Sequence, residues 1–383
     1  MRKKQNKKLN IAMLGHKVVP SRRGGIELVL TSLCPLLVSD GCRITCFNRS
    51  NSPVENEYCG TVKGGYYKGV RLKTVPALDV KGLAAVTSSH FAAFRAAVGP
   101  YNIVHFHAEG PCAAMWIPKL FGKKCIATVH GLDWKRDKWR GGPGAAFIHL
   151  GEWMCVKLAD EIIVLNKENQ QYFEEKYGRK TVLIPNGVDR PEIRAPKLIT
   201  EKYGLEGNDY ILSLSRLTRE KGIHLLIEAY KKLDTDKKLV IAGPASDTDD
   251  YVASLKQMAA GDPDIIFTDF VSGETLDELY SNAYVYVLPS NLEGMPLSLL
   301  EAMAYGNAVV ASDISEIAEV AEGHALLFKM GDSADLKAKL EELLKDLQRV
   351  EDMQKSSPAY ILSKYNWADV AARTVELYKG LVK

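Results

Sequence analysis

Short apolar runs rich in β-branched residues alternate along this chain with longer segments whose apolar positions recur at helical spacing. In the first half, the short runs are residues 9–15, 43–49, 70–76, 102–107, 124–130 and 161–166. Residues 24–41 form the first amphipathic segment, which ends at Gly41. Such an alternation of strands and helices is typical of an α/β fold, in which helices cover both faces of a doubly wound parallel sheet.

The alternation pauses over residues 182–210, where proline, glycine and charged residues are frequent, and we interpret this stretch as a linker. Beyond it, the pattern predicts strands at residues 210–215, 238–243, 265–270, 284–290 and 308–313, and helices at residues 222–233, 250–261, 274–283, 295–306 and 335–350. A chain of 383 residues is longer than one typical domain. We therefore predict two Rossmann-like domains that meet near residue 190.

Composition excludes several classes of protein. The chain is 46% hydrophobic and 25% charged, and its formal net charge of +3 is too small to indicate a protein that binds nucleic acid. No apolar run approaches the roughly 20 residues that span a bilayer. The seven cysteines include no C-x-x-C pair, which favours free thiols over disulfides or zinc and predicts a cytoplasmic protein.

The N-terminus, MRKKQNKK, is strongly basic, with five cations in eight residues. No apolar segment of the kind found in a signal peptide follows it. A solvated tail is the simpler interpretation. The alternative is a peripheral contact with an anionic membrane surface, to which each cation contributes roughly 1 kcal/mol.

Arg216 and Lys221 lie within SRLTREKG, at the junction between a predicted strand and a predicted helix. Such a junction offers backbone N–H groups and the positive end of a helix dipole, both of which favour anions. Arginine can hold phosphate oxygens in a bidentate manner, and lysine acts as a point charge. The pattern favours a site for a diphosphate, and two surface cations on a solvated turn are the alternative.

Glu293 and Glu301 are eight residues apart in EGMPLSLLE. Pro296 suits the first position of a helix, which leaves Glu293 in the preceding loop and Glu301 inside the helix. If the segment were helical throughout, the two residues would lie about 12 Å apart along its axis. They are therefore not an acid–base pair acting on one atom. We expect each to accept hydrogen bonds from hydroxyls of a long ligand, the alternative being two ordinary helix glutamates.

Two glycines in the first half, Gly24 and Gly25, precede the first predicted helix. They permit a close backbone approach to a ligand, or they serve a tight turn. Neither a dinucleotide fingerprint nor a Walker A motif occurs in the sequence, so binding of NAD or ATP is not indicated.

Three histidines lie at the ends of predicted strands. His105 and His107 share one face of residues 102–107, and His130 ends residues 124–130. A three-histidine metal site is conceivable, but no carboxylate or cysteine lies at ligand spacing from these residues. We expect His107 and His130 to line a cleft and to bond sugar or acceptor groups. The Asp247-Thr248-Asp249 segment is interpreted as a solvated turn rather than a metal site.

Taken together, these residues resemble the retaining glycosyltransferases of family 4, which have the GT-B fold of two Rossmann-like domains facing each other across a cleft. The resemblance covers nearly the whole chain and rests on GGIE at 24–27, NGVD at 186–189, SRLTREKG, and Glu293-x7-Glu301. It implies an N-terminal acceptor-binding domain at 1–190 and a nucleotide-sugar-binding domain at 191–362. It also implies a C-terminal helix at 363–383 that returns to the first domain.

A finer resemblance concerns the N-terminal segment MLGHKVVPSRRGGIE. This segment is similar to a bacterial branch that includes rhamnosyl-type transferases for cell-wall and capsular polysaccharides. The chain departs from that branch at Gly15-His16-Lys17-Val18, where those enzymes often carry Gly-Ser-Arg-Gly. The donor and the acceptor therefore stay open.

The family resemblance implies a role for each matching residue in a hexosyltransferase-type enzyme. Arg216 and Lys221 would grip the donor diphosphate, and Glu301 would bind the ribose. Glu293 would hold the transferred sugar together with the backbone of Gly294, Met295, Pro296 and Leu297. His130 would contact that sugar from the other domain. Gly25, preceded by Gly24, would let the first domain approach the diphosphate or the acceptor.

The resemblance also implies the partners of the protein. The donor would be a UDP-, GDP- or dTDP-sugar, and no metal or other cofactor would be required. The acceptor would be a saccharide or a polyprenyl-diphosphate-linked saccharide, and nucleic acid would not be a partner. A nucleotide-sugar 2-epimerase and a non-catalytic nucleotide-sugar-binding module are the alternatives. Front-face transfer and double displacement are both open as mechanisms.

Overall fold

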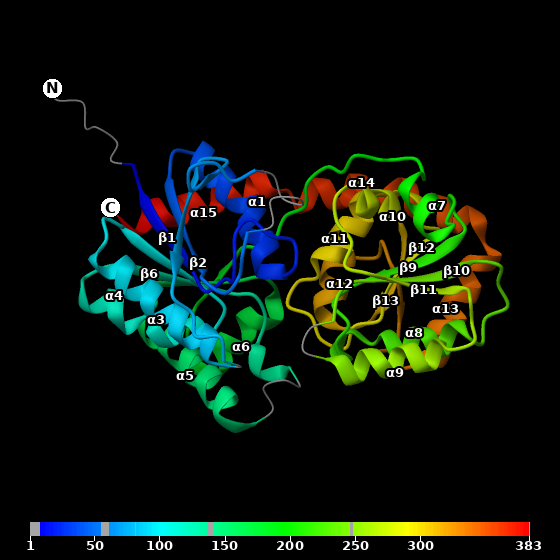
Figure 1. Ribbon diagram of the computed structural model, residues 1–383, viewed down its shortest axis with the longest axis horizontal. Coiled ribbons are helices and arrows are strands. Elements are labelled where there is room, and N and C mark those ends of the chain that lie inside the picture. The colour runs from blue at the N-terminus through cyan, green and yellow to red at the C-terminus, as the bar shows by residue number, and fades with distance from the viewer. Residues whose placement is uncertain (1–7, 55–60, 81, 137–140, 246–247, 383) are drawn as a thin grey trace. The chain divides into compact units, whose positions relative to one another are not determined.

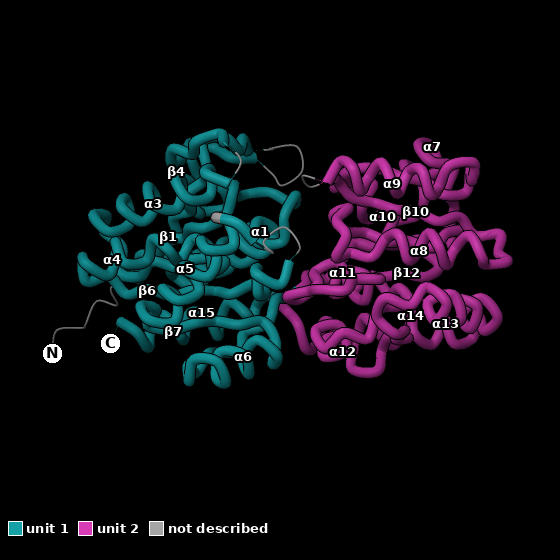
Figure 2. Tube along the Cα trace, turned by 90° about the horizontal axis from the view of Figure 1, so that it is seen from below, with its two compact units in different colours: residues 1–187, 367–383 teal, residues 188–366 magenta. Residues whose placement is uncertain are grey.

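The computed structural model describes residues 8–54, 61–80, 82–136, 141–245 and 248–382. Packing divides the chain into two compact units, residues 1–187 with residues 367–383, and residues 188–366 (Figure 2). Each unit contains one sheet with helices on both of its faces (Figure 1). The predicted fold class, an α/β protein built on two largely parallel sheets, is confirmed.

The first unit has an eight-stranded sheet in the order β3-β4-β2-β1-β5-β6-β7-β8. Its strands are β1 (Asn10–Leu14), β2 (Arg43–Arg49), β3 (Tyr66–Tyr67), β4 (Val70–Val75), β5 (Ile103–His107), β6 (Lys124–Val129), β7 (Glu161–Val164) and β8 (Val182–Leu183). Neighbouring strands run parallel except β3, which is antiparallel to β4. Strands β1, β5 and β6 are buried at nearly every position, as expected of parallel strands covered on both faces.

Helices cover both faces of this sheet. Helices α1 (Gly25–Ser39) and α15 (Trp367–Leu381) pack together on one face. The other face is covered by α3 (Leu83–Val98), α4 (Trp116–Leu120), α5 (Gly142–Leu158) and α6 (Lys167–Tyr177) (Figure 1). Two short 3-10 helices, η1 (Gly110–Ala114) and η2 (Asp133–Lys135), follow β5 and β6. The last helix of the chain therefore completes the first unit.

The second unit has a six-stranded parallel sheet in the order β11-β10-β9-β12-β13-β14. Its strands are β9 (Tyr210–Leu214), β10 (Lys238–Ala242), β11 (Ile265–Asp269), β12 (Val285–Leu288), β13 (Ala308–Ser312) and β14 (Leu326–Phe328). Its helices are α7 (Leu198–Tyr203), α8 (Ile223–Tyr230), α9 (Asp249–Ala259), α10 (Glu274–Asn282), α11 (Leu297–Ala304), α12 (Ser315–Ala321), α13 (Ser333–Lys345) and α14 (Leu347–Lys364). Helices α8, α9 and α13 cover one face, and α10, α11 and α14 the other (Figure 1).

The structure corrects two expectations. Residues 182–210 are not a featureless linker, because β8 adds an edge strand to the first sheet and α7 forms one short helix before β9. Residues 335–350 are not one helix either. Asp346 separates α13 from α14, and its side chain accepts a hydrogen bond from the Arg349 N–H at 3.0 Å, which caps the new helix.

Some residues considered above carry no structural statement. The basic residues 1–7, Cys59 and Asp247 lie outside the described residues. The six described cysteines are buried and free, which agrees with the predicted thiols. None of the described helices combines the length and the apolarity needed to cross a bilayer.

A close backbone approach joins two loops at the carboxyl edge of the second sheet. Gly222 begins α8 with φ +66°, and a Cβ atom placed there would lie 2.0 Å from the carbonyl oxygen of Pro289, directly after β12. The Asn291 N–H also donates to the Glu220 carbonyl at 2.7 Å. The loops after β9 and β12 are thus held together along their backbones, and a side chain at position 222 would separate them.

The close backbone contact between Gly222 and Pro289 predicts that Gly222→Ala destabilises the protein. Gly204 is the matched control, because it ends α7 at φ +61° with no atom within 4 Å of its would-be Cβ. Alanine at Gly204 should cost about 1–2 kcal/mol from the left-handed backbone alone. Alanine at Gly222 should cost at least about 1 kcal/mol more, since the clash adds to the same backbone cost. Urea unfolding measures both losses, and equal losses would contradict the close approach.

Candidate active site

The predicted phosphate-binding loop follows β9 in the second unit. Arg216 lies two residues after the strand, and the 3-10 helix η4 (Arg219–Lys221) places Lys221 directly before α8. Buried Leu217 fixes the loop between them, because its N–H donates to the Pro244 carbonyl at 2.9 Å. The structure therefore holds both cations at the carboxyl end of a central strand, where ligands of open α/β sheets bind.

Lys221 and Glu293 form a largely buried ion pair. The Lys221 ammonium lies 2.5 Å from Glu293 Oε1, and the two side chains are 14% and 7% exposed. Ser290 Oγ donates to the same carboxylate oxygen at 2.7 Å. Two residues that the sequence singled out separately, 72 positions apart, thus meet in one contact. Sequence motifs predicted each residue but not this pairing.

The segment after Glu293 leads into α11. Gly294, Met295 and Pro296 are buried, and Pro296 precedes the helix with φ −76° and ψ 103°. The helix begins at Leu297, one residue later than predicted. Proline has no N–H group, so Pro296 cannot be one of the amide donors expected of this segment. The first N–H groups of a helix have no acceptor one full turn back and point toward its N-terminal end, although in α11 the Leu299 N–H donates to the Pro296 carbonyl at 3.2 Å.

Glu301 lies on α11 near two tyrosines. The Tyr280 hydroxyl donates to Glu301 Oε2 at 3.3 Å, and the Tyr286 hydroxyl donates to the Leu214 carbonyl at the end of β9, at 3.1 Å. Burial raises the pKa of Tyr286, and the nearby carboxylates of Glu293 and Glu301 raise it further. Tyr286 therefore has both glutamates and the last residue of β9 around it. The structure gathers the predicted acidic residues at one edge of the second sheet.

In the first unit, the structure separates the roles of three predicted histidines. His107 Nδ1 lies 3.1 Å from His130 Nε2, so these two form a pair at the ends of β5 and β6. His105 belongs to the core instead, because its ring nitrogens lie 2.7 Å from the hydroxyls of Tyr378 and Thr128. His105 and His107 are each 1% exposed, whereas His130 is only partly buried. Of the three, His130 is the side chain that a ligand can reach.

Burial keeps these histidines neutral. Burial lowers the pKa of His105 and of His130 to about 3, and it lowers the pKa of His107 well below its usual value. It also lowers the pKa of His16 to about 4, although the Glu27 carboxylate opposes this shift. At pH 7, His130 therefore exchanges hydrogen bonds without contributing positive charge.

The loop between β1 and α1 is held by polar side chains that the sequence did not reveal. Glu27 Oε1 accepts a hydrogen bond from the Lys17 N–H at 2.7 Å, and a Cβ atom on Gly24 would meet the other oxygen of that carboxylate. Asn48 accepts from the Val19 N–H at 3.0 Å. Glycine at position 24 thus leaves room for the Glu27 carboxylate. Gly25 has open space, with no atom within 4 Å of a would-be Cβ.

Glu109, directly beyond β5, was also missed by sequence reasoning. Its side chain is 0% exposed, and its Oε2 accepts from the Asp133 N–H at 2.9 Å in the segment that follows His130. Burial raises the pKa of Glu109 well above its usual value, and the carboxylates of Asp133 and Glu152 raise it further. Burial therefore favours the neutral form of the Glu109 carboxyl. The position of Glu109 just after a strand with a buried pattern is the feature of the sequence that could have identified it.

Glu152 on α5 is the partner of Glu109 and is also 0% exposed. Burial opposes its ionisation, but donors from Tyr177, Lys176 and Tyr172 lower the pKa of this carboxyl. The last two donate to Oε1 at 2.9 and 2.8 Å. Glu109 Oε1 and Glu152 Oε2 are buried without any other donor, and a proton on Glu109 would satisfy both atoms.

Within the described residues, no group of three histidine, cysteine, aspartate or glutamate side chains is arranged to hold a metal ion. The three predicted histidines do not converge on one point, because His105 bonds Tyr378 and Thr128 with both ring nitrogens. The polar groups found here suit hydroxyls and phosphates.

Each of the two units matches a family model of glycosyltransferases. Residues 23–191 match the family model described as Glycosyltransferase Family 4, and residues 197–359 match the one described as Glycosyl transferases group 1. The GDP-mannose-dependent alpha-(1-6)-phosphatidylinositol monomannoside mannosyltransferase of Mycolicibacterium smegmatis is 26% identical over 390 residues, which cover 94% of this chain and 96% of that protein.

Solved structures share the fold. Sucrose-phosphate synthase from Thermosynechococcus elongatus superposes with a TM-score of 0.82 at 20% identity, covering 98% of this chain and 99% of that one. Anabaena HepE in complex with UDP-glucose gives a TM-score of 0.80 at 17% identity, covering 97% of this chain and 100% of that one. Both units therefore have the fold of these solved structures.

The buried histidines predict a loss of stability in mild acid. His105 stays neutral in the folded protein down to about pH 3, whereas an unfolded histidine titrates near 6.5. Its contribution is therefore present above about pH 6.5 and is lost as the pH falls. Between about pH 7.5 and 5.5, His105→Gln should lose roughly 1 kcal/mol less stability than the natural protein, as measured by urea unfolding.

The comparison between the two proteins isolates His105. The raised pKa of Glu109 acts in the opposite direction, since its contribution is lost as the pH rises, but it is common to both proteins and cancels. An identical pH dependence of the two proteins would show that His105 is not held neutral by burial.

Proposed function

Because the chain is a family 4 glycosyltransferase with the GT-B fold, an enzyme of the hexosyltransferase class, we propose that it transfers a sugar from a nucleoside diphosphate with retention of configuration. The proposed acceptor is a saccharide or a polyprenyl-diphosphate-linked saccharide. The observation that carries the proposal is the Lys221–Glu293 pair beside Arg216, at the carboxyl edge of β9 and β12.

The pair suits the bond that breaks in this reaction. A nucleotide sugar has its phosphate and its first hydroxyls on either side of one glycosidic oxygen. Lys221 Nζ and Glu293 Oε1 are 2.5 Å apart, so a ligand with its phosphate on Lys221 would bring sugar hydroxyls to Glu293. A cation binds the phosphate, and a carboxylate accepts from the hydroxyls. One contact thus offers complementary partners for both parts of the donor.

Catalysis in this proposal comes from stabilising the leaving group. Negative charge builds on the diphosphate as the glycosidic bond breaks, and fixed cations lower the barrier by stabilising that charge. Arg216 and Lys221 are proposed for this role, helped by the N–H groups at the start of α8. Glu301, which is held by Tyr280, would accept hydrogen bonds from the ribose hydroxyls.

The front-face route to retention is favoured by the state of Glu293. Its carboxylate oxygen already binds the Lys221 ammonium and the Ser290 hydroxyl. A carboxylate so engaged is a weaker nucleophile, because each donor stabilises the negative charge that would attack the anomeric carbon. The leaving phosphate itself would then take the proton of the attacking acceptor hydroxyl.

The first unit is proposed to help bind the acceptor and the transferred sugar. His130 is neutral and paired with His107, so it can offer a hydrogen bond to a hydroxyl without attracting the phosphates. Gly25 leaves open space beside the backbone at the start of α1. We also propose that Gly24 and the segment from Gly294 to Leu297, which includes Met295, have the binding roles that the sequence predicts. Pro296 has no N–H group, so it would contribute only its shape.

The donor class is supported by the relatives. The named mycobacterial relative depends on GDP-mannose, and the Anabaena structure contains UDP-glucose. A UDP-, GDP- or dTDP-sugar therefore suits this chain, and we propose a role in bacterial cell-wall or capsular polysaccharide synthesis of the rhamnosyl-type branch. A cytoplasmic enzyme with peripheral contact at the inner membrane would meet a lipid-linked acceptor there.

The phosphate-binding role predicts the effect of removing each cation. Arg216→Ala and Lys221→Ala should each lower kcat/KM by at least roughly a hundredfold, equivalent to about 2.7 kcal/mol of transition-state stabilisation. Arg219→Ala is the matched control. It removes one cation from the same turn, but the Arg219 guanidinium lies over the Tyr251 ring at 5.4 Å, and its loss should change kcat/KM less than about threefold.

Steady-state transfer to a lipid-linked saccharide, with folding checked by near-UV circular dichroism, measures these effects. Near-normal turnover of both Arg216→Ala and Lys221→Ala would contradict the assignment. Conversion of the donor to an epimer without any acceptor would point to the 2-epimerase instead. Tight donor binding without transfer to any acceptor would point to a binding module.

A second prediction concerns metal ions. Arg216 and Lys221 place two fixed cations at the proposed diphosphate site, where a divalent ion would otherwise stabilise the charge of the leaving group. Transfer should therefore continue at an unchanged rate in excess EDTA. A strict requirement for added Mn²⁺ or Mg²⁺, with activity restored on titration, would refute this account of the leaving group.

A further inference from the structure

Three neighbouring helices of the first unit expose many large apolar side chains. The exposed residues lie on α3, α4 and α5 and directly after α4, and they are between 45% and 74% exposed: Phe91, Phe94, Val98, Trp116, Leu120, Phe121, Leu150 and Trp153. We call this set the α3–α5 face. In the described part of the second unit, the exposed large apolar residues are Ile193, Met330 and Leu347. Most of the apolar exposure of the described residues thus lies in the first unit, where Tyr66, Leu78, Val80, Leu83 and Val382 are also exposed outside this set.

The helix α3 has its amphipathic pattern reversed. Its buried positions are small residues, Ser88, Ser89, Ala92, Ala93, Ala96 and Ala97. Phe91, Phe94 and Val98, three or four residues apart, form the outward stripe. A soluble helix ordinarily turns its large apolar residues to the core and polar residues to water. Alanines that let α3 approach the sheet closely explain the inner face, but they do not explain phenylalanines on the outer one.

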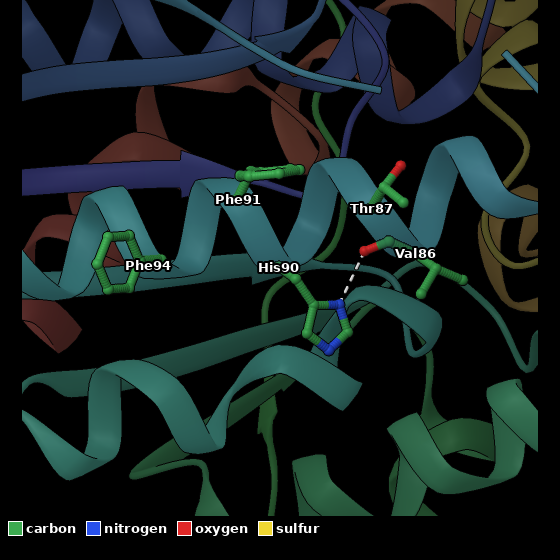
Figure 3. A pocket seen from close by; sticks show the side chains of 5 residues that line it. All are labelled: Val86, Thr87, His90, Phe91 and Phe94. Carbon is green, nitrogen blue, oxygen red and sulfur yellow. Dashed lines mark hydrogen bonds between the residues drawn. The ribbon is translucent and has the colours of Figure 1, made fainter. Parts of the chain in front are cut away.

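The exposed residues belong to one continuous surface. Helices α3, α4 and α5 lie side by side over the same face of the sheet, and α4 packs against both of the others (Figure 1). Figure 3 shows the α3 residues Val86, Thr87, His90, Phe91 and Phe94, which line a shallow hollow of about 420 Å³. The His90 ring turns one nitrogen to the Val86 carbonyl at 2.8 Å, so that ring edge is satisfied within the helix. The hollow is accordingly apolar.

The exposed charges on α3 and α5 are positive, whereas Lys119 on α4 is paired at 2.9 Å with the carboxylate of Asp160, which is 15% exposed. Between Asp79 and Asp133 the single acidic residue is Glu109, and within α5 it is Glu152. Both are 0% exposed. Arg95 on α3 and Lys157 on α5 are exposed cations at the border of the apolar residues. The described helices therefore present aromatic and aliphatic side chains bordered by positive charge, with no exposed carboxylate among them.

We propose that the α3–α5 face docks this protein on an anionic lipid bilayer. Aromatic side chains favour the interface between headgroups and acyl chains, and cations favour anionic headgroups. A second copy of the chain fits less well. A symmetric dimer through this face would place Arg95 and Lys157 against a second copy of the same surface, whose helices α3, α4 and α5 offer no exposed carboxylate to pair with them. The proposal deepens the proposed function, since a lipid-linked acceptor lies at such a surface, but its geometry does not depend on the reaction.

Vesicle flotation of the full chain tests the proposal. The vesicles are equal parts phosphatidylglycerol and phosphatidylcholine, compared with phosphatidylcholine alone. The natural protein should float with the anionic vesicles, and Phe91→Ser with Phe94→Ser should weaken that partition at least tenfold. The matched control is Ile193→Ser with Leu347→Ser, which removes two exposed apolar residues from the second unit and should leave the partition unchanged. Arg95→Ala with Lys157→Ala should weaken binding to the anionic vesicles only.

Three outcomes would overturn the proposal. The first is a natural protein that does not float with anionic vesicles. The second is a Phe91→Ser, Phe94→Ser variant that floats like the natural protein. The third is a dimer in sedimentation velocity that this variant alone converts to monomer while vesicle binding persists, which would assign the face to a second copy. Arg216→Ala should float normally, so a failure of the proposed reaction is distinguishable from a failure of docking.

Discussion

The ion pair between Lys221 and Glu293 is the interaction on which the second unit's site depends. Placing two charges in a largely buried position costs solvation, and the pair is stable only because its geometry is close and a further hydrogen bond from Ser290 completes it. The pair also joins the loops after β9 and β12, whose backbones already meet at Gly222 and Asn291. Charge and backbone therefore fix the same two loops, which gives the site its shape before any ligand arrives.

The candidate site residues of the two units differ in their physical chemistry. In the second unit, full charges meet at the carboxyl edge of the sheet, which suits phosphates. In the first unit, burial holds His107 and His130 neutral, and it favours the neutral form of Glu109. Uncharged donors and acceptors suit hydroxyl groups. A donor with phosphates and an acceptor with hydroxyls would thus each find the half of the protein that matches its chemistry.

Local sequence patterns predicted those features of the structure that depend on residues close together in the chain. Runs such as residues 102–107 predicted strands because they are rich in apolar and β-branched residues, as strands buried on both faces are. Arg216, Lys221, Glu293 and Glu301 were singled out because they lie at or after strand–helix junctions, and their roles in a site stay a prediction. Strand β8, with two residues, is too short to show a pattern. The pairing of Lys221 with Glu293 and of Glu109 with Glu152 could not be predicted, since those contacts join segments that fold together only in three dimensions.

The place of α15 has a consequence for how this chain is made. The helix packs on α1, and its Tyr378 hydroxyl bonds His105 at 2.7 Å across 273 residues of sequence. A ribosome releases all of the second unit before it releases this helix. The amino-terminal half is therefore synthesised first but closes last, with one side of its core open to water and to chaperones until α15 has been made.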